Sequence, residues 1–130
     1  MDKQKSLRSS AVLTGSYVAA TVWGPSGGNT AVDPSEHNTL LLNLAFTIGS
    51  LDSLELKIEF SDDGTTYYQE VEETISNGTG SDTPLVHQFD ASGNSQLAVA
   101  IATRYIKVSV KGTGTVTSSL LAIDAVLTNR

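Results

Sequence analysis

Apolar and polar residues alternate along several stretches of this chain, which is the pattern of β-strands. Over residues 40–48 every even position is apolar and the odd positions are mixed. Over residues 54–60 leucine, isoleucine and phenylalanine alternate with glutamate and lysine. Because successive side chains of a strand point to opposite faces of the sheet, both stretches are predicted to be strands with one buried face.

Turn-forming residues punctuate these strands. An Asp-Gly pair at positions 63 and 64 follows the strand at 54–60 and predicts a hairpin with a return strand over residues 67–71. Residues 77–83 are rich in Gly, Ser, Thr and Asp and are predicted to be a surface loop. Residues 106–110 alternate again, and the Gly-Thr-Gly run at 112–114 predicts a turn into a last strand, paired antiparallel to the preceding one.

Two other stretches give weaker signals. Residues 12–23 are β-prone, and a glycine-rich loop follows them to about residue 36. Residues 91–102 predict a loop with a short element, because glycine and asparagine interrupt any helical pattern. The strands recur every 10 to 15 residues or so, without a helix that could form a crossover. The fold class predicted is all-β, an antiparallel β-sandwich of jelly-roll type with about 7–8 strands.

Composition supports one domain. The chain has 130 residues, 39% of them hydrophobic, and about a quarter are serine or threonine. A domain of this size can bury roughly two thirds of its unfolded surface. We expect residues 1–10, which are mostly polar and hold Lys3, Lys5 and Arg8, to form a flexible N-terminal arm, and residues 11–130 to form a single β-sandwich domain.

Charge and residue types exclude several functions. Eight basic and fourteen acidic residues give a net charge of -6, which disfavours nucleic acid as a partner. The longest apolar run is far shorter than the ~20 residues of a membrane helix, so no membrane partner is expected. Without cysteine the chain has no disulfide, thiolate metal site or thiol nucleophile.

Candidate catalytic groups lack a supporting pattern. His37 and His87 are far apart and have no metal-ligand spacing. Serines are abundant, but no Gly-x-Ser-x-Gly motif occurs. We therefore expect no enzymatic activity, no catalytic or metal-ligating residue and no cofactor.

Carboxylates cluster at two places. Asp62 and Asp63 precede a glycine, and Glu70, Glu72 and Glu73 follow closely. A hydrolase needs a shielded cleft to separate the pKa values of such groups, whereas these belong to a turn and its flank. The Asp-Asp-Gly run could offer oxygens to calcium, but the rest of an EF-hand loop is absent, and a hairpin turn explains it better.

Two segments resemble a known family. The run IEFSDDGTTY at residues 58–67 and the run ATRYIKV at residues 102–108 are similar to paired strand signatures of discoidin-type, galactose-binding-like jelly rolls. The similarity covers about half of the chain and implies the fold. The ligand-loop residues of that family have no clear match here.

The chain as a whole resembles small virion proteins of tailed bacteriophages. The shared features are the short length, the absence of cysteine, the richness in Ser, Thr and Gly, and the polar N-terminal segment. This resemblance implies a non-enzymatic structural protein, a capsid decoration or cement protein made in the host cytoplasm and placed in the virion. Its expected partners are major capsid or other virion proteins and further copies of itself, as a homo-oligomer. Lys3, Lys5 and Arg8 would bind an acidic neighbour.

An alternative function stays open at this point. The chain could be a carbohydrate-binding β-sandwich module of a phage tail or a cell-surface protein. Trp23, Tyr67 and Tyr68 would then stack on a sugar ring.

Overall fold

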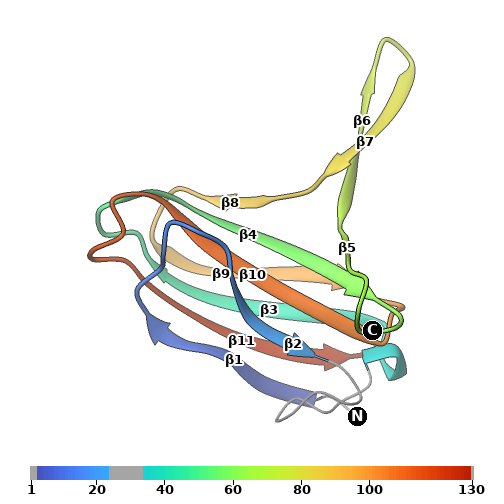
Figure 1. Cartoon of the computed structure of the whole chain (residues 1–130), viewed down its shortest axis with the longest axis horizontal. Helices are drawn as coiled ribbons and strands as arrows, with labels where there is room; N and C mark the ends of the chain where they lie inside the picture. The colour runs from blue at the N-terminus through green and yellow to red at the C-terminus, as the bar shows by residue number, and fades with distance from the viewer. Residues whose placement is uncertain (1–2, 24–33, 130) are drawn as a thin grey trace.

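Two antiparallel β-sheets pack face to face and enclose the core. The structure, a computed structural model, describes residues 3–23 and 34–129. Figure 1 shows the two sheets as layers, from which one hairpin projects. The predicted all-β antiparallel sandwich is therefore confirmed.

The first sheet is four-stranded and has the strand order β1-β11-β3-β9. Its strands are β1 (Lys3–Ala11), β11 (Leu120–Thr128), β3 (Thr39–Thr47) and β9 (Gly93–Ala100). Each neighbouring pair runs antiparallel. A short 3-10 helix, η2 (Pro34–Glu36), precedes β3.

The second sheet is five-stranded, with the order β2-β10-β4-β5 and with β8 also paired to β4. Its strands are β2 (Val18–Trp23), β10 (Tyr105–Gly114), β4 (Leu51–Ser61), β5 (Tyr68–Gln69) and β8 (His87–Phe89). Between β5 and β8 the chain forms a separate two-stranded hairpin of β6 (Val71–Ser76) and β7 (Thr79–Pro84). We call this hairpin the β6–β7 ribbon.

Successive strands change sheets along most of the chain. Strands β1, β3, β9 and β11 belong to the four-stranded sheet, and β2, β4 and β10 belong to the five-stranded one. Since β5 and β8 lie along the same side of β4, they occupy one strand position interrupted by the ribbon. The sandwich then has about the number of strand positions predicted. Jelly rolls share this alternation between sheets, and the jelly-roll type stays a prediction that rests on the strand order.

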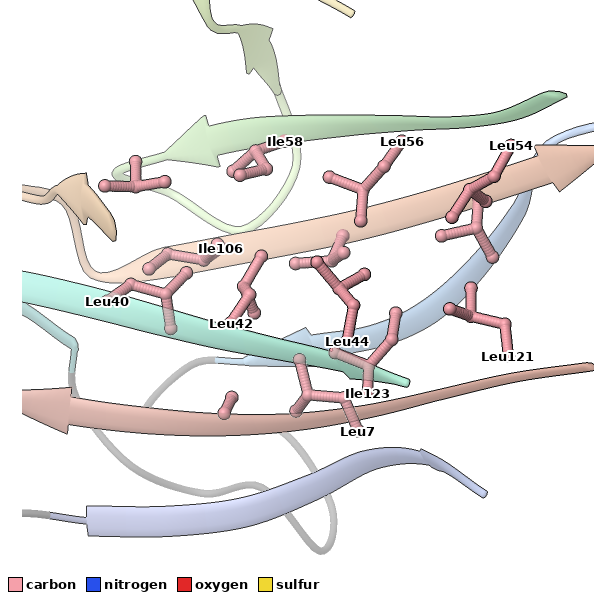
Figure 2. Close-up of a cluster of buried hydrophobic side chains, with 14 of the residues drawn as sticks. Leu7, Leu40, Leu42, Leu44, Leu54, Leu56, Ile58, Ile106, Leu121 and Ile123 are labelled. Carbon is pink, nitrogen blue, oxygen red and sulfur yellow. The ribbon is translucent and has the colours of Figure 1, made fainter. Parts of the chain in front are cut away.

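The core lies between the sheets and is almost entirely aliphatic. Figure 2 shows side chains from both layers pointing toward one another. The buried core residues on the four central strands are Leu40, Leu42, Leu44 and Phe46 of β3, Leu51, Leu54, Leu56 and Ile58 of β4, Ile106, Val108 and Val110 of β10, and Leu121, Ile123, Ala125 and Leu127 of β11. The alternation seen in the sequence therefore marks the inward face of each of these strands.

The predicted hairpin between the last two strands is wrong. Strand β10 pairs with β2 and β4, whereas β11 pairs with β1 and β3 in the other sheet. The Gly-Thr-Gly run lies within the end of β10, and the chain crosses to the opposite layer after it. Alternation shows that a strand has one buried face, but it does not identify the neighbouring strand.

Two weakly patterned segments are also strands. Residues 93–100, expected to be a loop with a short element, form the edge strand β9, in which only Val99 is buried. Residues 3–11 form the edge strand β1, which pairs with β11 from Lys3↔Leu127 to Ala11↔Leu121. Leu7 enters the core from β1. The expected arm over residues 1–10 is thus a strand over most of its length.

Candidate functional site

The β6–β7 ribbon is an insertion into a strand that would otherwise be continuous. On β4, Glu59 pairs with Gln69 of β5, and Leu56 pairs with His87 of β8. An unbroken antiparallel strand would place residue 72 opposite Leu56. His87 takes that position, so residues 71–85 are additional to the sheet.

The ribbon turns on an Asn-Gly pair and is exposed throughout. Asn77 and Gly78 have positive φ angles of 53° and 76°, as a two-residue type I′ hairpin requires. Every residue of β6 and β7 is exposed. Val71 is 57% exposed and Ile75 is 68% exposed. In Figure 1 the ribbon stands clear of both sheets.

One face of the ribbon combines apolar side chains with two carboxylates. Val71, Glu73 and Ile75 share a face because their positions alternate along β6. Glu73 is directly opposite Asp82 on β7, a like-charge pair that destabilises a ribbon. Residues 71–84 contain no lysine or arginine. Within the described part of the chain, no ion pair is formed by either carboxylate.

Hydrogen bonds fix the base of the ribbon against the sandwich. The amide of Glu70 donates to the carbonyl of Ile58 on β4 at 2.9 Å, and the amide of Leu85 donates to the carbonyl of Glu70 at 2.8 Å. The Gln69 side-chain amide donates to the carbonyl of Leu85 at 3.0 Å. His87 Nε2 lies 2.9 Å from Glu70 Oε1. These contacts set the direction in which the ribbon leaves the sheet.

The outward face of β4 and β10 carries a second concentration of functional groups. Lys57 and Lys107 are 3.7 Å and 3.9 Å from the same carboxylate oxygen of Glu59. Lys111 is 3.2 Å from Glu55. Lys57 and Lys107 thus share one carboxylate, whereas Lys111 has a carboxylate of its own.

Two tyrosines cover these lysines. The ammonium of Lys107 lies 4.3 Å from the ring centre of Tyr67, and those of Lys57 and Lys111 lie 4.5 Å and 5.0 Å from the ring centre of Tyr17. Such cation–π contacts contribute about 0.5–1 kcal/mol each at exposed sites. Burial raises the pKa of both tyrosines, so both stay neutral. We call the surface formed by Lys57, Lys107, Lys111, Tyr17, Tyr67, Glu55 and Glu59 the Lys–Tyr face.

The loop after β4 forms a shallow depression beside an exposed ring. Tyr68 is 70% exposed and lines a cavity of about 230 Å³ with Asp62, Asp63 and Thr66. The amides of Thr66 and Thr65 and the hydroxyl of Ser61 donate to Asp63 Oδ1 and lower the pKa of that carboxyl. The predicted hairpin is confirmed, but its return strand β5 is only two residues long.

The structure separates the residues predicted to bind a partner or a sugar. Lys3 and Lys5 belong to the edge strand β1, where charged residues discourage pairing with another sheet edge. The guanidinium of Arg8 donates to the carbonyls of Leu121, Ala11 and Val12, and burial lowers its pKa. Arg8 therefore has a structural role here.

The three aromatic residues of the sugar hypothesis have different surroundings. Tyr67 belongs to the Lys–Tyr face, whereas Tyr68 lies next to the depression described above. Trp23 ends β2, and its side chain lies outside the described part of the structure.

The two histidines lie at different places in the fold. His37 is buried beside η2, and its amide donates to the carbonyl of Pro34, whereas His87 contacts Glu70 at the ribbon base. Within residues 3–23 and 34–129, no group of three or more His, Cys, Asp or Glu side chains is arranged to hold a metal ion. Over the same residues, no helix has the length and apolarity needed to cross a membrane.

Comparisons with known proteins give no relative. No protein-family model matches the chain, and neither a curated protein nor a solved structure matches it.

Sequence reasoning missed both the ribbon and the Lys–Tyr face. The Asn-Gly pair at 77 and 78 was a hairpin signal, but the residues after it lack the apolar alternation of a strand. The outward positions of Lys57 and Lys107 follow from the alternation of β4 and β10. The position of Tyr17 over Lys57 and Lys111 could not be predicted, because Tyr17 belongs to a distant segment of the chain.

Proposed function

We propose that this chain is a non-enzymatic structural protein of a tailed-bacteriophage virion, a capsid decoration protein that attaches to the assembled particle and to copies of itself. The observation that carries the proposal is the β6–β7 ribbon, which projects from the sandwich and exposes Val71 and Ile75. Exposed apolar groups on a projecting element are typical of a surface for another protein. The virion setting rests on the resemblance to small phage structural proteins in length, in composition and in the polar N-terminal segment.

The ribbon gains stability when another protein covers it. An isolated two-stranded hairpin is at best marginally stable in water. Burying the exposed parts of Val71 and Ile75 against a partner would contribute roughly 2–4 kcal/mol before the costs of association. The hydrogen bonds at the base hold the ribbon in one direction in advance, which lowers the entropy lost on docking.

The genomic setting and capsid binding test this function. We expect the gene to lie among phage structural genes. We also expect the chain to co-sediment with empty capsids of that phage. Val71→Ser with Ile75→Ser should abolish co-sedimentation, whereas Thr74→Ser with Thr83→Ser, on the opposite ribbon face, should keep it. A gene outside any phage genome, or a chain that stays in the supernatant at tens of micromolar, would overturn the virion role.

A carbohydrate-binding module of a phage tail or a cell-surface protein is the second candidate, and the surroundings of Tyr68 favour it. An exposed ring beside Asp62, Asp63 and Thr66 offers both a stacking surface and hydroxyl acceptors, as sugar sites do. A glycan array probed with the intact chain tests this candidate. Binding that is lost in Tyr68→Ala but kept in the exposed-site control Leu120→Ala would support it, and an array without signal would exclude it.

A further inference from the structure

We propose that the ribbon's partner is a second copy of this chain, and that the ribbon face bearing Val71, Glu73 and Ile75 lies on the Lys–Tyr face of that copy. The inference rests on the proposed function in one respect, because it takes the ribbon as a docking element. It goes further in naming both surfaces of the contact.

The charges of the two surfaces are complementary. On the ribbon, Glu73 and Asp82 face each other without a cation. On the Lys–Tyr face, Lys57 and Lys107 share the single carboxylate of Glu59. Placing the first pair over the second brings two carboxylates next to two lysines that share one carboxylate, and such complementarity selects the partner and its register.

Both surfaces also combine apolar groups with charges. On the ribbon, Val71 and Ile75 flank Glu73 on the same face of β6. On the Lys–Tyr face, the ring of Tyr67 lies over Lys107, and the ring of Tyr17 lies over Lys57 and Lys111. The two rings therefore offer apolar surface to Val71 and Ile75 next to the lysines that would meet the ribbon's carboxylates.

The ribbon's direction makes the contact intermolecular. Its base is held by the Glu70–Ile58 and Leu85–Glu70 hydrogen bonds, and it points away from its own sandwich (Figure 1). It is consequently held clear of the Lys–Tyr face of its own chain. A reciprocal exchange of ribbons between two copies would satisfy both surfaces and close the assembly as a dimer.

A charge-reversal experiment on the full chain tests the contact. Sedimentation velocity over a range of concentrations at low salt should show self-association of the wild-type chain. Glu73→Lys with Asp82→Lys on the ribbon should weaken association by at least about tenfold, as should Lys57→Glu with Lys107→Glu on the face. An equimolar mixture of the two variants should associate again, because each supplies the surface that the other has lost.

Matched controls separate this contact from a general charge effect. Glu72→Lys with Thr83→Lys makes a similar change on the opposite face of the ribbon and should leave association unchanged. Lys57→Gln with Lys107→Gln removes both charges without adding carboxylates. It replaces the reversed variant if that variant does not fold, and it should also weaken association. Circular dichroism verifies the fold of each variant.

The outcomes distinguish this inference from the proposed function. A wild-type chain that stays monomeric but co-sediments with capsids through Val71 and Ile75 would overturn the self-contact and support the capsid role. A chain that self-associates as described but does not bind capsids would support the contact and overturn the capsid role. Association that is unchanged by both charge reversals would also overturn the contact.

Discussion

Deleting residues 71–85 is expected to leave a folded sandwich. The deletion joins Glu70 directly to Val86, so that one residue stands between Glu70 and His87. The pairings Glu59↔Gln69 and Leu56↔His87 on β4 require one residue at that point. The shortened chain therefore runs along β4 in register.

The energy terms of this deletion nearly cancel. The deletion removes two hydrogen bonds made by Leu85. Its amide donates to the carbonyl of Glu70, and its carbonyl accepts from the side-chain amide of Gln69. Each bond contributes about 0.5–1.5 kcal/mol. Removing the insertion also removes the entropy cost of closing a loop of that length, roughly 2 kcal/mol. The bond from the Glu70 amide to Ile58 is kept. The free energy of unfolding should change by no more than about 1 kcal/mol.

Urea unfolding followed by far-UV circular dichroism measures this change, and sedimentation velocity on the same samples measures association. We expect an unchanged unfolding midpoint together with loss of self-association. A loss of more than about 3 kcal/mol would refute the reasoning, because it would show that the ribbon supports the sandwich. Full self-association by the shortened chain would show that the ribbon is not the contact.

Three further changes test the core, a turn and a titrating group. Leu56→Ala removes a fully buried side chain and should lower the unfolding free energy in urea by about 2–5 kcal/mol. Gly49→Ala should lower it by about 1–2 kcal/mol or more, since Gly49 has a φ of 58° and an added Cβ would collide with the Ser118 carbonyl. NMR titration should give Asp63 a pKa below 3.8, and Ser61→Ala should raise it. Because the pKa of Asp63 is depressed in the folded chain, its ionised carboxyl stabilises the fold at pH values above the ordinary pKa. This stabilisation is lost as the pH falls through the depressed pKa.

The fold class could be predicted because the central strands have strict alternation. In β3, and over residues 54–58 of β4, each inward position is a large aliphatic or aromatic residue, and these positions are buried. The Asp-Gly turn after β4 likewise marked a real hairpin. Which strands become neighbours depends on contacts between distant segments, so the pairing of β10 and β11 could not be decided from local pattern.

The edge strands could not be predicted from the sequence pattern, because few of their side chains are buried. In β1 Leu7 alone enters the core, and the lysines and serines around it are typical of a solvated segment. Its strand structure comes from pairing with β11, and the hydrogen bonds of Arg8 to backbone carbonyls help to hold its end. Local sequence contains neither of these long-range contacts.

The candidate site was only partly accessible to sequence reasoning. Tyr67 and Tyr68 were correctly singled out as aromatic groups, but the structure assigns them to two different surfaces. The ribbon's carboxylates were noticed as Glu72 and Glu73. Their separation onto opposite faces follows from the strand structure of β6, and the position of Asp82 opposite Glu73 required the register of β6 against β7.

The insertion of the ribbon between two aligned halves of a strand makes this chain a scaffold for peptide display. A foreign epitope joined between Asn77 and Gly78 would sit at the farthest point of a hairpin whose two strands are wholly solvent-accessible. Hairpin tips of this kind tolerate added sequence. Grafting there would leave the hydrophobic interior untouched, so the length and chemistry of the tip can be varied independently of the framework.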